Sequence, residues 1–184
     1  VILIGEIRDR ETMSSAIAYA QSGHLCLATL HGNNSYQALN RILSFYPAEV
    51  RPTMLGDLAS SLKAIVSQRL VPRADGKGRV PAVEVMVSTA RVRELIDDKE
   101  KTKLLRDTIQ AGYTTYGMQT FDQSLMWLLK QEIITFEEAL RQCSNPDDFK
   151  LKVSGVSSTS DLSWEDFDKE KGSDGGSDPG IERF

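Results

Sequence analysis

Residues 1–10 read VILIGEIRDR, and this stretch decides the fold class. Four aliphatic residues in a row are typical of a strand that is buried on both faces, as in the centre of a parallel sheet. Gly5 ends the strand, and the carboxylate of Glu6 follows at once. In open α/β folds, ligands bind at the carboxyl edge of the strands, so Glu6 is expected where chemistry is done. An apolar strand that ends in an acid is also typical of the second half of a nucleoside triphosphatase site, where the acid helps to position Mg²⁺ or polarises the attacking water.

A helix and a second strand are expected soon after the first strand. Residues 11–22 carry apolar side chains at helical spacing, and Gly23 follows as a helix-ending residue. Residues 25–30 predict a second buried strand, which includes Cys26 as a small buried side chain and ends at His31. A strand, a helix and a strand with short joints imply a right-handed crossover and parallel pairing. His31 is therefore expected at the same sheet edge as Glu6.

The rest of the chain predicts helices and one hairpin. Strands at 69–72 and 79–87 flank the turn residues Asp75-Gly76-Lys77-Gly78, and helices are expected at 35–45, 47–69, 89–96, 101–111, 120–131 and 135–143. From residue 153 onward the chain is rich in Ser, Gly and Asp and is expected to be disordered. Within it, the acidic and aromatic segment 162–167 has two interpretations, either part of a solvated tail or a segment that docks on a basic groove.

Composition narrows the classes of function. The chain is 40% hydrophobic and 26% charged, which is ordinary for a globular protein. Its two cysteines, Cys26 and Cys143, lie outside any C-x-x-C motif, which argues against a disulfide or zinc site and fits a reducing cytoplasm. Residues 154–184 hold eight acidic and three basic residues, and the preceding part shows no basic stripe. Nucleic acid is therefore a poor candidate partner.

Two features predict that the chain is the C-terminal part of a longer protein. It begins inside what should be a core strand, and such a strand needs neighbours to cover its faces and complete its hydrogen-bond ladder. The phosphate-binding motif G-x-x-x-x-G-K-[ST] also does not occur in the 184 residues. The phosphate loop and the N-terminal part are therefore expected upstream of Val1.

Several further segments, taken together with residues 5–9, carry a resemblance to a known family. They are Ser22-Gly23-His24-Leu25, Thr29-Leu30-His31, Pro47-Ala48-Glu49, Ser67-Gln68-Arg69-Leu70, Ala82-Val83-Glu84-Val85-Met86 and Gly117-Met118-Gln119-Thr120-Phe121. With them the chain resembles, over residues 1–145, the secretion-type ATPases of type II secretion and type IV pili. Residues 5–9 look like that family's Walker B motif, and residues 22–31 look like its histidine box.

The segment that follows Gln68-Arg69-Leu70 separates the branches of this family. Assembly and secretion ATPases carry a four-cysteine zinc loop there, whereas residues 71–78 contain no cysteine. The chain is therefore similar to the retraction branch, the PilT/PilU family, which powers pilus disassembly and twitching motility. Residues 25–34, 63–70 and 75–79 look more like PilU than PilT.

The resemblance implies an α/β fold, namely the C-terminal part of a RecA-like P-loop ATPase core over residues 1–87. A helical C-terminal subdomain over 88–152 and an acidic tail over 153–184 would follow. ATP and Mg²⁺ are implied as ligands, with no metal ligand from this chain. The implied partners are identical subunits in a hexameric ring, a partner retraction ATPase and an inner-membrane pilus platform protein, which places the protein in the cytoplasm at the inner membrane. Without the upstream phosphate loop, this fragment alone is expected to be inactive.

The resemblance also assigns roles to individual residues. Glu6 is expected to be the general base or the water-orienting carboxylate, and His31 is expected to sense the γ-phosphate. Candidates for the nucleotide shell or a subunit interface are Arg8, Arg10, His24, Thr29 and Asn33. For Arg8 and Arg10, an ion pair with Asp9 or Glu11 is the alternative. His24 precedes the second strand, about 20 Å from His31 along an extended chain, so a structural or interface role is favoured for it.

One motif of the family is only partly kept. The Ala-Ile-Arg-Asn-Leu-Ile motif, which the family links to retraction rather than hydrolysis, retains Arg93, Leu95 and Ile96 of its core. This departure, together with the usual role of PilU as an accessory motor, favours a PilU-like accessory retraction ATPase. The alternatives are a non-catalytic ring or partner component of the pilus motor, and a type II secretion or pilus assembly ATPase.

Overall fold

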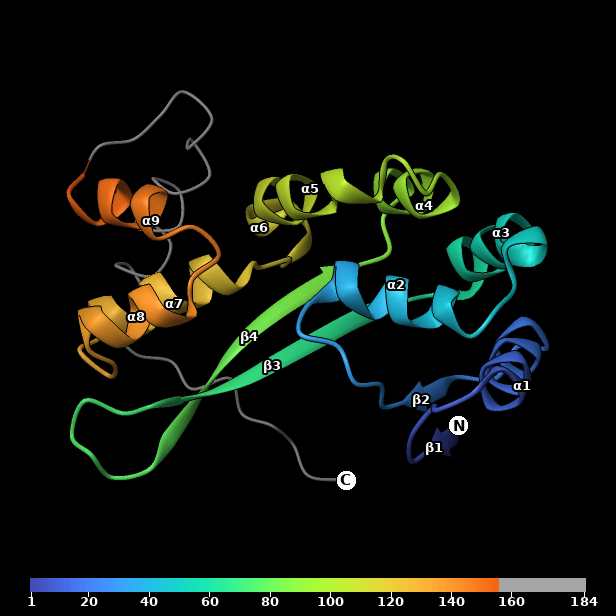
Figure 1. Ribbon diagram of the computed structural model, residues 1–184, viewed down its shortest axis with the longest axis horizontal. Coiled ribbons are helices and arrows are strands. Elements are labelled where there is room, and N and C mark those ends of the chain that lie inside the picture. The colour runs from blue at the N-terminus through green and yellow to red at the C-terminus, as the bar shows by residue number, and fades with distance from the viewer. Residues whose placement is uncertain (156–184) are drawn as a thin grey trace.

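The structure is a computed structural model, and it describes residues 1–155. The helices and strands follow one another along the chain as shown in Figure 1, with these bounds: β1 (Ile2–Ile4), α1 (Arg10–Gln21), β2 (Cys26–Ala28), α2 (Ser35–Ser44), α3 (Arg51–Ser61), β3 (Ala64–Pro72), β4 (Arg79–Val87), α4 (Ala90–Asp97), α5 (Leu105–Ala111), α6 (Tyr113–Tyr116), α7 (Phe121–Lys130), α8 (Phe136–Gln142) and α9 (Pro146–Val153). Single 3₁₀ turns at Ala48–Val50 and Thr102–Leu104 precede α3 and α5. The described strands form two sheets, β1 with β2 and β3 with β4.

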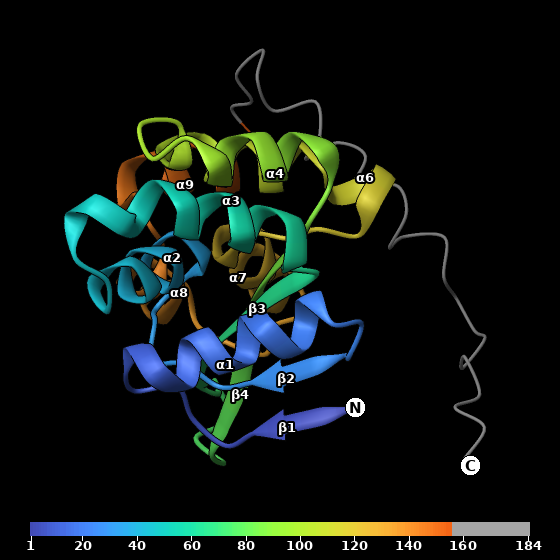
Figure 2. The same cartoon turned by 90° about the vertical axis from the view of Figure 1, so that its right-hand side faces the viewer.

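The predicted strand–helix–strand unit at the start of the chain is confirmed. β1 and β2 pair in parallel, with Leu3 opposite Leu27, and α1 lies along one face of the pair (Figure 2). The side chain of Asp9 caps α1 by accepting a hydrogen bond of 2.8 Å from the backbone N–H of Thr12. Gly23, with φ at +93°, takes the left-handed conformation that lets the chain turn from α1 into β2.

The first strand was predicted to be buried on both faces and the second strand to be buried, and both predictions are wrong for the described part of the chain. Leu3 is 77% exposed and Leu27 is 50% exposed, whereas Ile4, on the α1 face, packs against the core. Side chains alternate between the faces of a strand, and α1 covers one of them. Cys26 is accordingly half-buried rather than buried.

The predicted helix over 47–69 is also wrong beyond residue 61. α3 ends at Ser61, Leu62 is extended, and residues 64–72 form β3. β3 pairs antiparallel with β4 along nine residues, from Ala64 opposite Val87 to Pro72 opposite Arg79. The apolar residues in 62–66 fit a helical spacing, but their pairing with a distant strand outweighs that local pattern. The hairpin itself was predicted, and β4 has the predicted bounds.

The hairpin contributes side chains to both hydrophobic clusters of the described chain. Met86 belongs to the cluster formed with α1–α5, whereas Val71 and Ala82 belong to the cluster formed with α7, α8 and α9. In Figure 1 the hairpin accordingly runs from the region of α2 and α3 to the region of α7 and α8. The division of the chain at residue 87 stays a prediction.

The predicted helices after the hairpin are confirmed as α4, α5 with its 3₁₀ turn, α7 and α8, and two short helices, α6 and α9, were not predicted. A capping box between Thr120 and Gln123 starts α7. Among residues 1–155 no helix is both long and apolar enough to cross a membrane. The disordered tail was predicted from residue 153, but Val153 is the last residue of α9. The rest of that prediction beyond residue 155, and the prediction for segment 162–167, lie outside the described part.

Candidate functional site

The segments that leave β1 and β2 bring Glu6 and His31 into contact. The backbone N–H of Ile7 donates to the carbonyl of Thr29 at 2.9 Å, which holds the two segments side by side. His31 Nε2 then lies 2.9 Å from Glu6 Oε1. Because a carboxylate can only accept, His31 Nε2 carries the proton of this hydrogen bond. The parallel pairing of the strands predicts this meeting at one sheet edge, while the roles of the two residues stay predictions.

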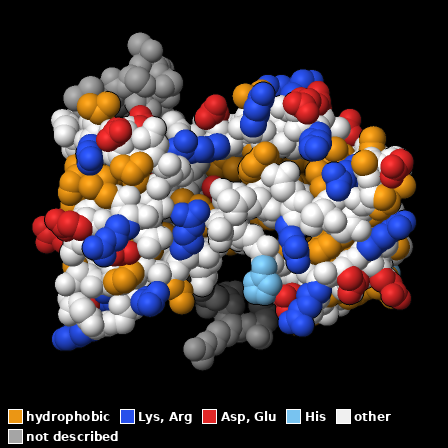
Figure 3. Space-filling view, viewed as in Figure 1, with side chains coloured by type: hydrophobic (Ala, Val, Ile, Leu, Met, Phe, Trp, Pro, Cys, Tyr) orange, Lys and Arg blue, Asp and Glu red, His pale blue; other side chains and the backbone are white. Residues whose placement is uncertain are grey.

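The second carboxylate oxygen of Glu6 bonds to the guanidinium of Arg8. The alternative prediction, an ion pair of Arg8 with Asp9 or Glu11, is therefore not what the structure shows, because Arg8 pairs with Glu6. Asp9 instead caps α1. The side chain of Glu6 is 23% exposed and that of His31 is 90% exposed. Figure 3 shows a histidine side chain at the surface beside side chains of both charges. The cluster is thus open to solvent and to ligands.

Arg8 also sets the protonation of Glu6. The hydrogen bond from Arg8 is the main cause that lowers the pKa of Glu6 below its ordinary value, and His31 adds to the effect while partial desolvation opposes it. The same bond raises the pKa of Arg8. Glu6 is therefore ionised at neutral pH and available as a hydrogen-bond acceptor.

Replacing Arg8 with Gln should raise the pKa of Glu6 toward its ordinary value of 4.5. The pKa of Glu6 is lower in the folded protein than in the unfolded chain, so the ionised carboxylate stabilises the fold above pH 4.5. This contribution to stability is lost as the pH falls through the lower pKa that Glu6 has in the folded protein. A carbon-detected NMR titration of Glu6 measures the shift. Arg10→Gln is the control, since the Arg10 guanidinium lies over the ring of Tyr46 at 5.6 Å. An unchanged Glu6 pKa in Arg8→Gln would contradict this account.

Thr29 and Asn33 stabilise the segment around His31. The hydroxyl of Thr29 donates to the carbonyl of Gly5, which ties the segment after β2 to the segment after β1. The carbonyl of Asn33 accepts a hydrogen bond of 3.2 Å from Arg69. In the described structure both residues therefore position the backbone beside Glu6 and His31.

His24 lies at the opposite end of β2 from His31. Its Nδ1 is 3.0 Å from the hydroxyl of Ser22, and its ring meets the ring of Tyr19 edge-on at 6.2 Å. These contacts place His24 at the end of α1 and apart from Glu6. They support the structural one of the two roles, structural or at an interface, that were predicted for it.

The retained residues of the retraction-linked motif lie on α4. Leu95 and Ile96 are fully buried in the core cluster. Arg93 is exposed, and its guanidinium donates to the carbonyl of Ser88 at 2.9 Å. The two apolar members are therefore packing residues of the described fold, and Arg93 is the member that presents a polar group at the surface.

Two residues of the hairpin, Arg69 and Glu84, hold the segment that follows His31, and neither was predicted as a site residue. Glu84 is buried, and its Oε1 accepts a hydrogen bond of 2.7 Å from the backbone N–H of Ser35. A single charge within Val83-Glu84-Val85-Met86 was the available signal. Its partner could not be predicted, because the contact depends on how α2 packs against the hairpin.

Gly32 is a further residue that the sequence did not mark. A Cβ atom built at Gly32 would lie 3.1 Å from both Cα and the backbone N of Ala38 in α2. Backbone atoms of a helix cannot move aside as a flexible side chain does. Gly32 therefore allows the segment that carries His31 to lie directly against α2.

Gly32→Ala should lower the free energy of unfolding by about 1–3 kcal/mol, the usual cost of inserting atoms into a packed contact. The measurement is urea denaturation of the protein, with Gly5→Ala as the control because a Cβ at Gly5 meets nothing within 4 Å. If the two variants unfolded at the same urea concentration, the close contact between Gly32 and α2 would be refuted.

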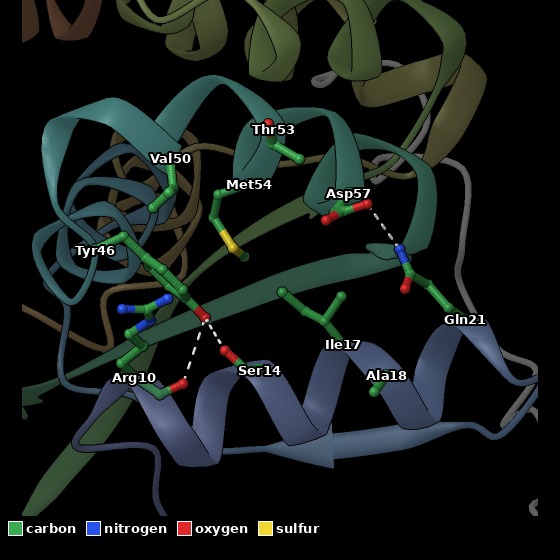
Figure 4. A pocket seen from close by; sticks show the side chains of 10 residues that line it. All are labelled: Arg10, Ser14, Ile17, Ala18, Gln21, Tyr46, Val50, Thr53, Met54 and Asp57. Carbon is green, nitrogen blue, oxygen red and sulfur yellow. Dashed lines mark hydrogen bonds between the residues drawn. The ribbon is translucent and has the colours of Figure 1, made fainter.

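Arg10 belongs to a separate pocket between α1 and α3 (Figure 4). The pocket has a volume of about 300 Å³ and is lined by Arg10, Ser14, Ile17, Ala18, Gln21, Tyr46, Val50, Thr53, Met54 and Asp57. Hydrogen bonds of 2.9 Å join Gln21 to Asp57 and Ser14 to Tyr46 across it. The structure thus separates Arg10 from Glu6 and His31.

Within residues 1–155, no group of three or more His, Cys, Asp or Glu side chains is arranged to hold a metal ion. That Mg²⁺ binds together with ATP stays a prediction.

The sequence of this chain is similar to those of known proteins. The family described as "Type II/IV secretion system protein" matches residues 1–141. The type IV pilus ATPase PilU of Pseudomonas aeruginosa is 48% identical over 153 residues, which are 83% of this chain and 40% of PilU. The type IV pilus retraction ATPase PilT of the same organism is 36% identical over 149 residues, 81% of this chain and 42% of PilT.

A solved structure of a protein from this family has a similar fold. The crystal structure of the pilus retraction motor PilT with bound ADP matches at a TM-score of 0.69 and 33% identity, over 80% of this chain and 40% of that chain. The α/β fold class predicted from the sequence is thereby confirmed. The chain spans about 40% of the length of the curated relatives named above.

Proposed function

The chain belongs to the type II/IV secretion system protein family, in its type IV pilus retraction branch, and from this we propose that its parent protein is an ATP-hydrolysing motor of pilus retraction. The observation that carries the proposal is the contact of Glu6 with His31 at the carboxyl edge of β1 and β2. A PilU-like accessory retraction ATPase is the specific form that we propose. The resemblance predicted from the sequence is confirmed by the family match and by PilU and PilT.

Glu6 would act as the acceptor for the attacking water. Phosphoryl transfer is accelerated mainly by positioning and by stabilisation of charge, so a fixed acceptor near the γ-phosphate is what the reaction needs. Arg8 and His31 each hold one oxygen of Glu6, which fixes the carboxylate plane and keeps it ionised. Mg²⁺ bound with ATP would neutralise charge on the phosphates.

His31 would report the presence of the γ-phosphate. Its Nε2–H donates to Glu6 in the described structure, and its side chain is largely exposed. A γ-phosphate at this edge would offer the same N–H a second anionic acceptor. The residue is thus placed to exchange one partner for the other as the nucleotide changes.

The wider assembly is part of the proposal. We expect a homo-hexamer, contact with a partner retraction ATPase and with the inner-membrane platform protein of the pilus, and a cytoplasmic position beside that membrane. Arg8 and Arg10 are the basic residues that we place nearest a subunit interface. The division into residues 1–87, 88–152 and 153–184 belongs to the same proposal.

A specific observation favours the retraction branch over an assembly or secretion ATPase. Residues 73–78 form a tight turn, with Arg73 paired to Asp75 at 2.9 Å and the Asp75 carboxylate accepting from the backbone N–H of Lys77 at 2.9 Å. Charged side chains and hydrogen bonds complete this turn, at the position where the other branches carry four cysteines. A turn of this kind needs no zinc.

The test is Mg²⁺-dependent ATP hydrolysis by the full-length protein, alone and mixed with a candidate partner motor. Turnover by the protein alone would establish an autonomous enzyme. Activity that is gained in the mixture only, and that requires Glu6, would support the accessory motor. Silence in both conditions would favour the second candidate, a non-catalytic ring component.

A further inference from the structure

The loop between β2 and α2, residues 29–34, carries His31 and is fastened at both of its ends. On one side Thr29 bonds to the segment that carries Glu6. On the other side Glu84 accepts from the backbone N–H of Ser35, and Arg69 donates to the carbonyl of Asn33 at 3.2 Å. The loop therefore joins the Glu6–His31 contact to the β3–β4 hairpin.

Arg69 reaches the C-terminal helices at the same time. Its Nη1 donates to the carbonyl of Gln142 at 2.9 Å. Gln142 is the last residue of α8, where carbonyls lack partners within the helix and the helix dipole favours a cation. The guanidinium also lies 4.1 Å from the centroid of Phe121, the first residue of α7. One side chain thus contacts the end of α8, the start of α7 and the β2–α2 loop.

The chemistry of these contacts suits the transmission of movement. Both hydrogen bonds of Arg69 end on main-chain carbonyls, so they depend on backbone position and not on which side chain a neighbour carries. A planar guanidinium can serve two acceptors at once, which a single ammonium group cannot do with the same geometry. A shift of Asn33 therefore acts directly on the group that caps α8.

We propose that Arg69 is a positioning residue that couples the β2–α2 loop, and with it His31, to helices α7 and α8. The inference rests on the proposed function, because His31 must respond to nucleotide for the coupling to act. When a γ-phosphate draws His31 from Glu6, the loop moves, the contact between Arg69 and Asn33 changes, and the cap on α8 is altered. Energetic coupling of this kind runs through contiguous packed and hydrogen-bonded groups.

Hydrogen exchange on the full-length protein tests the coupling. Exchange at residues 29–35 and 136–143 is compared with and without a non-hydrolysable ATP analogue and Mg²⁺, and both segments should respond in the natural sequence. In Arg69→Met the response at 29–35 should remain, while the response at 136–143 should fall by about 2- to 30-fold, the usual range for a coupling residue. Arg69→Lys keeps the charge but not the fork, and we expect it to lose most of the α8 response.

Arg79→Met is the matched control. Arg79 lies on the same hairpin, but its guanidinium donates to the carbonyl of Leu70 within the hairpin at 3.3 Å. Both responses should therefore stay as in the natural sequence. If Arg69→Met does not fold, Arg69→Lys decides the matter in the same assay.

Two outcomes would overturn the coupling while leaving the proposed function intact. One is an α8 response of natural size in the Arg69 variants. The other is an α8 segment that does not respond in the natural sequence although calorimetry shows that the analogue binds, which would leave Arg69 a purely structural cap. Failure of the full-length protein to bind the analogue at all would instead overturn the proposed function, and this inference with it.

Discussion

Glu6→Gln in the full-length protein should slow ATP hydrolysis by at least about 100-fold, the lower end of the range for losing a catalytic base. The amide keeps the shape of the side chain and one acceptor oxygen, but it cannot take a proton from water. ATP binding should be retained, because Glu6 is proposed to act on the attacking water and not to hold the phosphates. Steady-state hydrolysis and equilibrium binding of a fluorescent ATP analogue measure the two properties separately.

The control for this prediction is Glu11→Gln. Glu11 lies two residues further along than Asp9, in the first turn of α1, and is exposed. The same chemical change there should leave hydrolysis within about twofold, since surface substitutions usually cost little. Turnover near the natural rate in Glu6→Gln would remove Glu6 from the chemistry and leave it as a partner of Arg8 and His31 only.

Leu95→Ala should lower the free energy of unfolding by about 2–5 kcal/mol, the range for truncating a fully buried Leu. Leu95 has no exposed surface and packs in the cluster that joins α1–α5 to the hairpin. The loss combines the removed apolar contact with the cavity that remains. Chemical denaturation of the full-length protein measures it.

Leu151→Ala is the matched control, because Leu151 is 53% exposed on α9. It should change the stability by less than about 1 kcal/mol. A cost for Leu95→Ala as small as this would contradict the packing described for α4.

The burial of Leu95 and Ile96 also affects how the retraction-linked motif can be tested, because a loss of retraction in variants of these two residues would first reflect a loss of stability. Arg93 is the member of the motif whose substitution leaves the core intact.

The sequence predicted the parts of the fold whose signals are local. Gly23 marks the end of α1, and Asp75-Gly76 marks the turn of the hairpin. The parallel pairing of β1 with β2 followed from short joints around one helix, and it brought Glu6 and His31 to the same edge. The contact between Glu6 and His31 could therefore be predicted from residues 1–31, while the roles of the two residues stay predictions.

Features that depend on distant contacts could not be predicted. Ile65 and Val66 fit a helical spacing but are part of β3, because β4 lies beside them. The pairing of Arg8 with Glu6 depends on the path of the chain after β1, where Asp9 turns to cap α1. The contacts of Arg69 and Glu84 with the segment after His31 join residues 36 and 49 positions apart. No local pattern in either segment encodes such a contact.

We propose that Glu6 and His31 face the γ-phosphate of bound ATP. A structure of the full-length protein with a non-hydrolysable ATP analogue and Mg²⁺ would test this placement of the two side chains. The γ-phosphate should lie at the carboxyl edge of β1 and β2, within one water molecule of the Glu6 carboxylate and in contact with His31. A γ-phosphate bound farther than one bridging water from Glu6, with His31 still directed to Glu6 alone, would contradict it.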